Sequence, residues 1–268
     1  MGQEIHFELI NPQNTRAPWL IMVHGFTHNS GYFTAQIPVF QHNYRLCLVD
    51  LRGHGKSGDV PGPFGVEEYA DDLFDVLDKA KIDQAHFWGT HTGSAIALIM
   101  ALRQPERFKS LILEGTFLPG FPMPRVGELI NRARKIAKEN GIPNAREDWF
   151  NHADWFDVIR ANPNQCRAAA HHQLVDDFEG APWLSDLPAL AVTPAANFLN
   201  EIHMPVLVYN GEHDLPDFKQ AANFLKANLP NVQQAIIPNG GGFPAWEYPD
   251  TVNKLVKSYL YQLQGEYE

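Results

Sequence analysis

Residues 85–102 read AHFWGTHTGSAIALIMAL, which is the most informative stretch of the chain for its fold. Its first five residues form an apolar run that predicts a buried strand, and Ser94 to Leu102 predicts an apolar helix. Between the two stand Gly89 and Gly93, which suit a turn in which the backbone packs closely. The stretch therefore predicts a strand that enters a helix through a sharp turn, with His91 at the centre of the turn.

The same alternation of strand and helix extends in both directions along the chain. Short apolar runs typical of buried strands cover residues 19–23, 44–50, 110–114, 205–211 and 235–238. Apolar residues at helical spacing cover 66–80, and a last helix is expected to begin at about Asp250. Continuous apolar strands that alternate with helices predict an α/β fold, with a mostly parallel central sheet and helices on both faces.

The alternation breaks after residue 118. Pro119, Pro122 and Pro124 interrupt the chain, and a polar, helix-rich stretch follows to about Asn200. The sequence therefore predicts a core formed by residues 1–118 and 201–268, with a helical cap inserted at 119–200. We expect the aromatic residues of this cap to pack in its interior: Trp149, Trp155, Phe156 and Trp183.

Composition and charge limit the kinds of partner. The 268-residue chain has a formal net charge of −10, whereas nucleic-acid binding favours a basic surface. No apolar run approaches the roughly 18 residues of a membrane span, and the first nine residues have neither the basic nor the apolar region of a secretory leader. We expect a cytoplasmic protein that binds a small molecule, and neither nucleic acid nor a membrane. Monomer and homodimer stay open.

Neither cysteine chemistry nor a metal site is predicted. Cys47 lies in an apolar run and is interpreted as a small buried hydrophobic residue, and with Cys166 it makes no disulfide framework. A metal site formed by His91, His213 and a carboxylate has no HxxxH or Cys-x-x-Cys pattern to support it. We therefore expect no metal and no cofactor.

Four loops follow the ends of predicted strands, which is where ligands bind in open α/β sheets. They are His24-Gly25-Phe26-Thr27-His28, Gly89-Thr90-His91-Thr92-Gly93, Gly211-Glu212-His213-Asp214 and Gly240-Gly241-Gly242-Phe243-Pro244. The order and spacing of these loops resemble the α/β-hydrolase superfamily over nearly the whole chain. The turn DLRGHGKS at residues 50–57 looks like the DxRGxGxS turn of that family.

The resemblance aligns this chain with the family's catalytic positions, two of which carry other residues. The family's nucleophile stands at the centre of a G-x-S-x-G elbow, where this chain has His91. Its general base, a histidine in the loop after the last strand, corresponds to Gly242. Its usual acid corresponds to Asp214, and an alternative acid position used by some members corresponds to Glu114. Ser94, the nearest hydroxyl, lies one turn into the helix and is not expected to replace the nucleophile.

The two replacements suggest that an imidazole has moved. A ring is added at the pocket floor and another is lost from the wall beside it, so we expect His91 to occupy the gap at Gly242. There it would hydrogen-bond Asp214 or Glu114 and act as a general base. Cofactor-free dioxygenases of the superfamily resemble this arrangement in part, since they use a His–carboxylate pair.

The chemistry that follows is proton abstraction, water activation, or C–C or C–O cleavage, without a serine acyl-enzyme. The substrate would be a small, partly apolar molecule with a carbonyl or ester group. The resemblance implies an oxyanion hole formed by the backbone N–H groups of Phe26 and Thr92. The alternative is a catalytically silent protein of the same fold that binds a ligand or a partner.

The other residues at the strand ends are pocket candidates: His24, His28, His213, Gly242 and Phe243. His24 belongs to the His-Gly signature and is interpreted as a loop-packing residue more than as a ligand. His28 could line the pocket or face solvent, and His213 is interpreted as a loop histidine. The residues around Gly242 keep the family's pattern, so the loop is expected to keep its shape while lacking its base.

Overall fold

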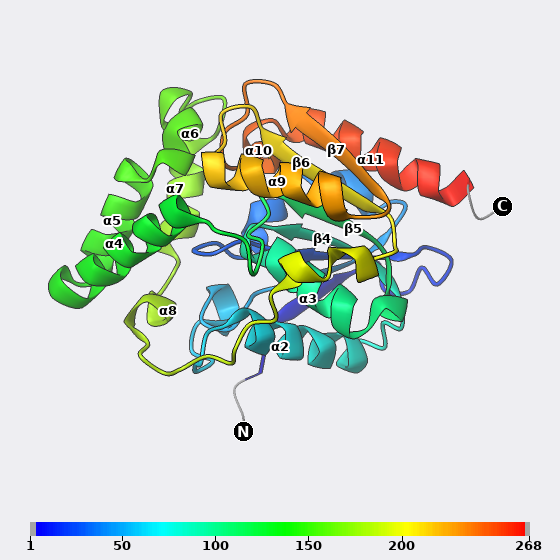
Figure 1. Ribbon diagram of the computed structural model, residues 1–268, viewed down its shortest axis with the longest axis horizontal. Helices are drawn as coiled ribbons and strands as arrows, with labels where there is room; N and C mark the ends of the chain where they lie inside the picture. The colour runs from blue at the N-terminus through cyan, green and yellow to red at the C-terminus, as the bar shows by residue number, and fades with distance from the viewer. Residues whose placement is uncertain (1–3, 266–268) are drawn as a thin grey trace.

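A seven-stranded sheet forms the centre of the computed structural model, which describes residues 4–265 (Figure 1). Its strands are β1 (Phe7–Ile10), β2 (Trp19–Val23), β3 (Arg45–Val49), β4 (Ala85–Thr90), β5 (Phe108–Glu114), β6 (Val206–Gly211) and β7 (Val232–Ile237). They lie in the order β1-β3-β2-β4-β5-β6-β7. β1 runs antiparallel to β3, and the other neighbouring pairs are parallel. Residues 1–3, which belong to the nine-residue start in which no secretory leader is predicted, lie outside the described residues.

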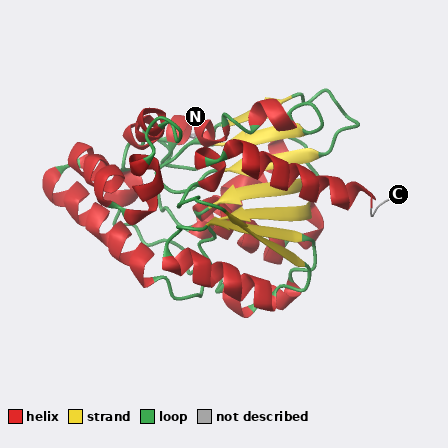
Figure 2. Ribbon diagram, turned by 90° about the horizontal axis from the view of Figure 1, so that it is seen from above, coloured by secondary structure: helices red, strands yellow, loops and turns green. Residues whose placement is uncertain are grey.

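Helices cover both faces of this sheet (Figure 2). Alternate side chains of β2 point to opposite faces, as strand geometry requires. Leu20 and Met22 belong to a hydrophobic cluster that includes residues of α1 (Ile37–Phe40) and α11 (Pro249–Gly265). Ile21, which lies between them in the strand, belongs to a second cluster. This cluster includes residues of α2 (Val66–Lys79), α3 (Thr92–Arg103) and α9 (Pro216–Asn228). The predicted three-layer α/β fold is confirmed.

Between β5 and β6 the chain forms a group of helices beyond the carboxyl ends of the strands, at the left of Figure 1. These helices are α4 (Pro124–Asn140), α5 (Ile142–His152), α6 (Asp157–Ala161), α7 (Ala168–Asp176) and α8 (Ala181–Leu184). Trp149, Phe156 and Trp183 are buried in the same cluster as Leu20 of the sheet. The helical group is therefore packed firmly onto the sheet domain.

The remaining short elements complete the loops. The 3-10 helices are η1 (Ser30–Phe33), η2 (Gly55–Ser57), η3 (Pro105–Arg107), η4 (Asp154–Phe156), η5 (Ala195–Asn197) and η6 (Leu199–Glu201), and a single α-helical turn, α10, covers Pro244–Glu247. Within residues 4–265, none of the helices combines the length and apolar character that crossing a membrane takes.

Candidate functional site

His91 stands at the turn between β4 and α3, in a backbone conformation that few residues other than glycine adopt. Its φ is 48° and its ψ is −106°, which costs of order 1–3 kcal/mol when a side chain is present. The glycines on either side are required by space. A Cβ at Gly89 would lie 2.4 Å from the Gly93 carbonyl, and a Cβ at Gly93 would lie 2.2 Å from the Val23 oxygen. The predicted sharp turn is therefore present, with an imidazole at its centre.

The imidazole of His91 lies between two glycine backbones and two phenyl rings. A Cβ at Gly115 would lie 2.8 Å from Nε2 of His91, and a Cβ at Gly25 would lie 3.2 Å from Nδ1. Gly115 has a φ of 49°, so the absence of a side chain there serves both the backbone and the ring. The ring centroids of Phe218 and Phe243 lie 5.1 and 4.9 Å from that of His91.

Both ring nitrogens of His91 are buried, and neither makes a hydrogen bond of good geometry with another described residue. Burial lowers the pKa of His91 to about 4. A weak hydrogen-bond contact with the Gly242 backbone raises this pKa, but by less than burial lowers it. The imidazole is therefore neutral near pH 7. It carries one N–H donor and one lone pair, and a weak contact with the Gly242 backbone is the nearest that either comes to a hydrogen bond within the described part of the chain.

The predicted hydrogen bond between His91 and a carboxylate is absent, because both carboxylates have other partners. Glu114 accepts hydrogen bonds from Tyr32 Oη at 2.5 Å and from the Ala245 N–H at 2.9 Å. Burial raises the pKa of Glu114 to about 7, and the hydrogen bonds oppose the shift. Its backbone, however, does meet the elbow, since the His91 N–H donates to the Glu114 carbonyl at 2.8 Å.

Asp214 is also fully engaged. It accepts hydrogen bonds from Asn210 Nδ2 and from the Leu215 N–H, both at 2.7 Å. Burial raises the pKa of Asp214 to about 7, again against the effect of these bonds. Ser94 donates to the carbonyls of Gly89 and Glu114 at 2.7 and 3.1 Å, so its hydroxyl is committed to holding the turn.

Trp155, and not His91, occupies the gap that a glycine leaves at position 242. A Cβ at Gly242 would lie 2.7 Å from both the Cβ and the carbonyl oxygen of Trp155. A Cβ at Gly241 would similarly lie 2.8 Å from Cβ of Val158. The segment around η4 thus packs directly on the loop of residues 240–244, here called the glycine loop. The expectation that the His91 ring fills this gap is wrong, because the room for that ring comes from Gly25 and Gly115.

A cavity of about 40 Å³ lies above the elbow. Four predicted residues line it: Phe26, His91, Thr92 and Phe243. The other lining residues were not among the predicted pocket residues: Thr27, Phe117, Val126, Ile130, Trp149, Trp155 and Phe218. The clustering of aromatic residues between 149 and 156 is the sequence signal that could have indicated these pocket residues. It was interpreted as packing in the interior of the cap alone. The cavity is small and almost wholly apolar, whereas pockets that hold drug-sized ligands have volumes of roughly 300–1,000 Å³.

Phe26 and Thr92, which line this cavity, have backbone N–H groups without a partner among the described residues. Thr92 is the first residue of α3, where an N–H has no partner inside the helix and a negative charge is favoured. The neighbouring Thr27 accepts a hydrogen bond from Trp149 Nε1 at 3.0 Å, which ties α5 to this loop.

Three predicted pocket histidines do not line the cavity. His24 is buried with both nitrogens used, since Nδ1 bonds the Gly25 carbonyl at 2.7 Å and Nε2 accepts from the Leu51 N–H at 3.0 Å. Its interpretation as a loop-packing residue fits these contacts. His28 is buried and bonds His171 Nε2 of α7 at 2.6 Å through its own Nε2. His213 is exposed.

No cluster of three or more metal-ligating side chains occurs among residues 4–265. Cys47 and Cys166 are both buried and free, and burial raises the pKa of the Cys47 thiol to about 12. That thiol is therefore protonated at neutral pH, and a thiolate nucleophile is not available from it.

The contact between Gly115 and His91 predicts an energetic coupling. We expect Gly115→Ala to destabilise the fold by about 2–4 kcal/mol, because a methyl group at this positive φ is strained and also meets the imidazole. In a His91→Ala background the cost should fall to about 1–2 kcal/mol, which is the backbone part alone. Urea unfolding of the four proteins measures this. Equal costs in both backgrounds would show that the ring does not rest on Gly115.

Comparison with known proteins adds family relationships to this geometry. The model described as alpha/beta hydrolase fold matches residues 18–162. The protein of Stutzerimonas stutzeri (strain A1501) that carries the name carbamate hydrolase RutD is 24% identical over 266 residues, which cover 98% of each chain. The 3-oxoadipate enol-lactonase 2 of Acinetobacter baylyi is 29% identical over 203 residues, 74% of this chain and 72% of that protein. The crystal structure of the enol-lactonase from Burkholderia xenovorans LB400 matches with a TM-score of 0.82 at 20% identity, over 96% of each chain.

Proposed function

The chain belongs to the alpha/beta hydrolase fold family, and on that premise we propose that it binds a small carbonyl-bearing molecule at the elbow and acts on it through the imidazole of His91. The chemistry is acid–base catalysis in place of a serine acyl-enzyme. The fold is shared with hydrolases, whereas this reaction is inferred from the residues at the site.

One observation carries the proposal. A neutral imidazole whose two nitrogens make no hydrogen bond of good geometry is held on a strained turn, beside a cavity and two amide groups without partners among the described residues. Strain and buried polar atoms without partners each cost free energy, and both gather at functional sites. A chain that only needed to close this turn could do so at lower cost with a small residue. That the chain keeps His91 here despite this cost in stability supports a functional role for the imidazole.

The proposed steps use the backbone and one side chain. The substrate carbonyl oxygen accepts hydrogen bonds from the N–H groups of Phe26 and Thr92, which stabilise the negative charge that develops there. The His91 ring turns one nitrogen from the glycine backbones toward the cavity. Its lone pair takes a proton from water as the water oxygen bonds to the carbonyl carbon. The bond to the leaving oxygen or nitrogen then breaks, and the imidazolium returns the proton to that atom. With a proton on the carbon beside the carbonyl, the same lone pair removes it to form an enolate and returns it to the enolate. In this scheme neither Glu114 nor Asp214 touches the ring, so their predicted catalytic roles are not retained.

The substrate class follows from the cavity and from the relatives. The lining is apolar and the space is small, which favours a compact molecule with few polar groups beyond its carbonyl. The names of two relatives refer to a carbamate and an enol-lactone, and both groups contain an acyl carbonyl. We propose lactones, enol esters and carbamates with fewer non-hydrogen atoms than benzene as the first compounds to test, because the cavity is small.

A second candidate is ligand binding without turnover. It is favoured by the shielding of both His91 nitrogens and by the lack of a carboxylate that would fix the tautomer of the ring. In this reading the imidazole fills space above the glycine backbones, and the cavity and the two amides alone recognise the ligand.

His91→Ala separates the two candidates. If His91 is the acid–base group, turnover of the active compound should fall by about 10²–10⁴-fold while its binding and the fold persist. Because only the neutral ring accepts a proton, wild-type turnover should be level from pH 6 to 8 and should decline toward the His91 pKa of about 4. The exposed His213 provides the control, since His213→Ala should leave turnover unchanged.

Other outcomes identify the alternatives. Unchanged ligand binding in His91→Ala, with no turnover in the wild type, would establish the silent protein. We expect fluorophosphonate probes to label no serine under either candidate, because Ser94 is hydrogen-bonded within the turn. Stoichiometric labelling of a serine would contradict both.

A further inference from the structure

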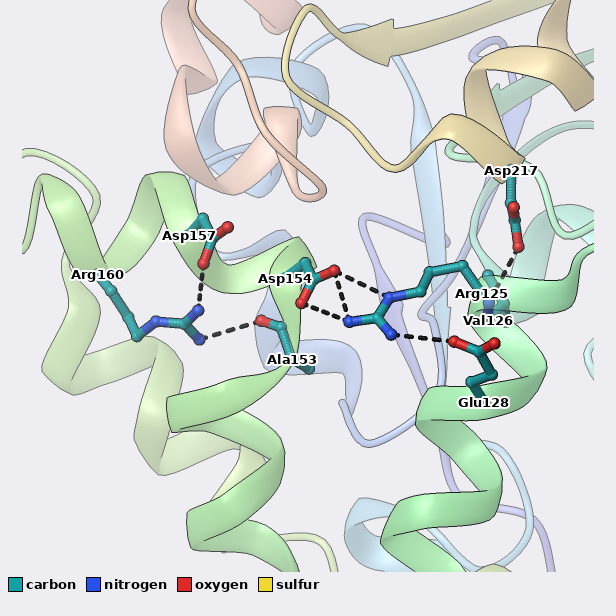
Figure 3. Close-up of polar contacts among 8 residues, drawn as sticks. All are labelled: Arg125, Val126, Glu128, Ala153, Asp154, Asp157, Arg160 and Asp217. Carbon is teal, nitrogen blue, oxygen red and sulfur yellow. Dashed lines mark hydrogen bonds and ion pairs between the residues drawn. The ribbon is translucent and has the colours of Figure 1, made fainter.

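A cluster of charged residues surrounds the turn that carries Trp155 (Figure 3). Asp154, the residue before it, accepts a two-pronged interaction from the Arg125 guanidinium of α4, with Nη2 to Oδ1 at 2.8 Å and Nε to Oδ2 at 2.9 Å. Arg125 also bonds Glu128 on its own helix at 3.0 Å. The ion pair between Arg125 and Asp154 therefore joins α4 to η4.

The helix that provides this arginine is itself fixed to the sheet domain. The N–H of Val126, in the first turn of α4, donates to Asp217 Oδ2 of α9 at 3.0 Å in a buried hydrogen bond. A carboxylate at this position satisfies a free N–H and complements the positive end of the helix. Arg125 therefore projects from a helix end that is fixed to the sheet domain. Through its ion pair with Arg125, Asp154 is also fixed relative to that domain.

Arg160 constrains the same turn from the other side. It donates to the carbonyls of Ala153 and Phe150 and pairs with Asp157 of its own helix. The chain from the end of α5 into α6 is thereby held at both ends. Trp155 lies between these two points.

Trp155 closes the cavity from this turn. Its side chain is 7% exposed, lines the cavity above His91, and meets the Trp149 ring at a centroid distance of 4.6 Å. Its backbone rests on Gly242. The indole Nε1 has no hydrogen-bond partner among the described residues, so packing and the flanking ion pairs hold the ring in place.

We propose that Trp155 is the residue that limits ligand size at this site, and that the Arg125–Asp154 ion pair holds it in the closed position. The inference rests on the proposed function in that it concerns the same cavity. The side chains of Arg125 and Asp154 are 40% and 42% exposed. Exposed ion pairs contribute little to stability and weaken with salt. Such a pair can release the turn, and with it the indole, without unfolding the helices.

Benzene is a suitable probe, because its binding requires no turnover. Empty apolar cavities of about 150 Å³ bind it, whereas the present cavity of about 40 Å³ is too small. We expect no benzene binding to the wild-type protein by NMR, and binding at least about tenfold tighter in Trp155→Ala, a difference of about 1.4 kcal/mol. Trp155→Phe, which removes less volume, should lie between them and guards against a failure of the alanine variant to fold.

The ion pair is tested by removing one charge at a time. Asp154→Asn should admit benzene, by loosening the turn while the indole is intact. Glu128→Gln is the matched control, because it removes the other carboxylate partner of Arg125 without touching η4, and it should behave as wild type. Folded Trp155 variants that still exclude benzene would overturn the size limit. Equal behaviour of Asp154→Asn and Glu128→Gln would overturn the role of the ion pair. Either result is independent of whether His91→Ala alters turnover.

Discussion

Replacing Gly242 with histidine is expected to destabilise the fold by more than about 3 kcal/mol and to restore no esterase activity. The Cβ alone would lie 2.7 Å from the backbone oxygen of Trp155, and such contacts with backbone cannot be relieved by a change of rotamer. The imidazole would in addition have to displace the backbone of η4, which packs directly on position 242. Thermal and urea unfolding measure the loss.

The activity part uses the double variant His91→Ser, Gly242→His. This variant has all three residue types of the family's triad, yet we expect no labelling by fluorophosphonates, because the new base cannot reach its position. Gly240→Ala is the matched control for the loop. The nearest atoms to its added Cβ are the Gly211 Cα and the Ile237 carbonyl oxygen, both at 3.2 Å, so we expect it to cost less than Gly242→His, whose Cβ meets backbone at 2.7 Å. Labelling of the double variant, or a Gly242→His protein as stable as the wild type, would show that η4 yields readily.

Raising the pH from 6 to 8 is expected to weaken the fold through Glu247. This carboxylate accepts hydrogen bonds from the N–H groups of Gly241 at 2.5 Å and Phe243 at 3.3 Å. Burial nevertheless raises its pKa from an ordinary 4.5 to about 8. Between these values the folded protein holds a proton that the unfolded chain has lost. Stability therefore falls as pH rises toward 8, by up to about 1.4 kcal/mol per pH unit.

The measurement is urea unfolding of the wild type and Glu247→Gln across this range. We expect the wild type to lose roughly 2 kcal/mol relative to the glutamine variant between pH 6 and 8. Glu114→Gln should show a smaller difference, because the pKa of Glu114 is raised only to about 7. The buried histidines act in the opposite sense at lower pH: burial lowers the pKa of His91 to about 4, so its contribution is lost as pH falls from 6.5 toward 4. Parallel curves for wild type and Glu247→Gln would contradict the prediction.

The sheet and its order of elements could be predicted from the sequence because local patterns determine them. The predicted run 19–23 coincides with β2, and helix 66–80 ends within a residue of α2. β2 is buried throughout, so its apolar run is continuous, whereas α2 buries one face, so its apolar residues recur at helical spacing. β1 was not predicted, because it has four residues at a sheet edge and only partial burial. α9 was not predicted either, since small residues such as Ala221 and Ala222 form much of its buried face.

The site could be predicted only as far as backbone position determines it. His91, Phe26 and Thr92 meet at the cavity because they follow adjacent parallel strands. The hydrogen bond between Tyr32 and Glu114 could not be predicted from the sequence, because Tyr32 lies in η1, 82 positions away. The contact of Trp155 with Gly242 spans the helical group and the last loop, and no local pattern encodes it.

The glycine loop beneath η4 also constrains how this site can change over evolutionary time. Contacting positions combine non-additively, so the effect of one substitution depends on which others are already present. A histidine acquired first at position 242 would be selected against, because the overlying turn has no room for it. The turn would have to lift before that substitution became tolerable, and lifting it alone would expose apolar rings to water. Descendants of this chain should therefore diversify by altering the cavity lining, while acquiring a Ser-His-acid triad would require the changes in a particular order.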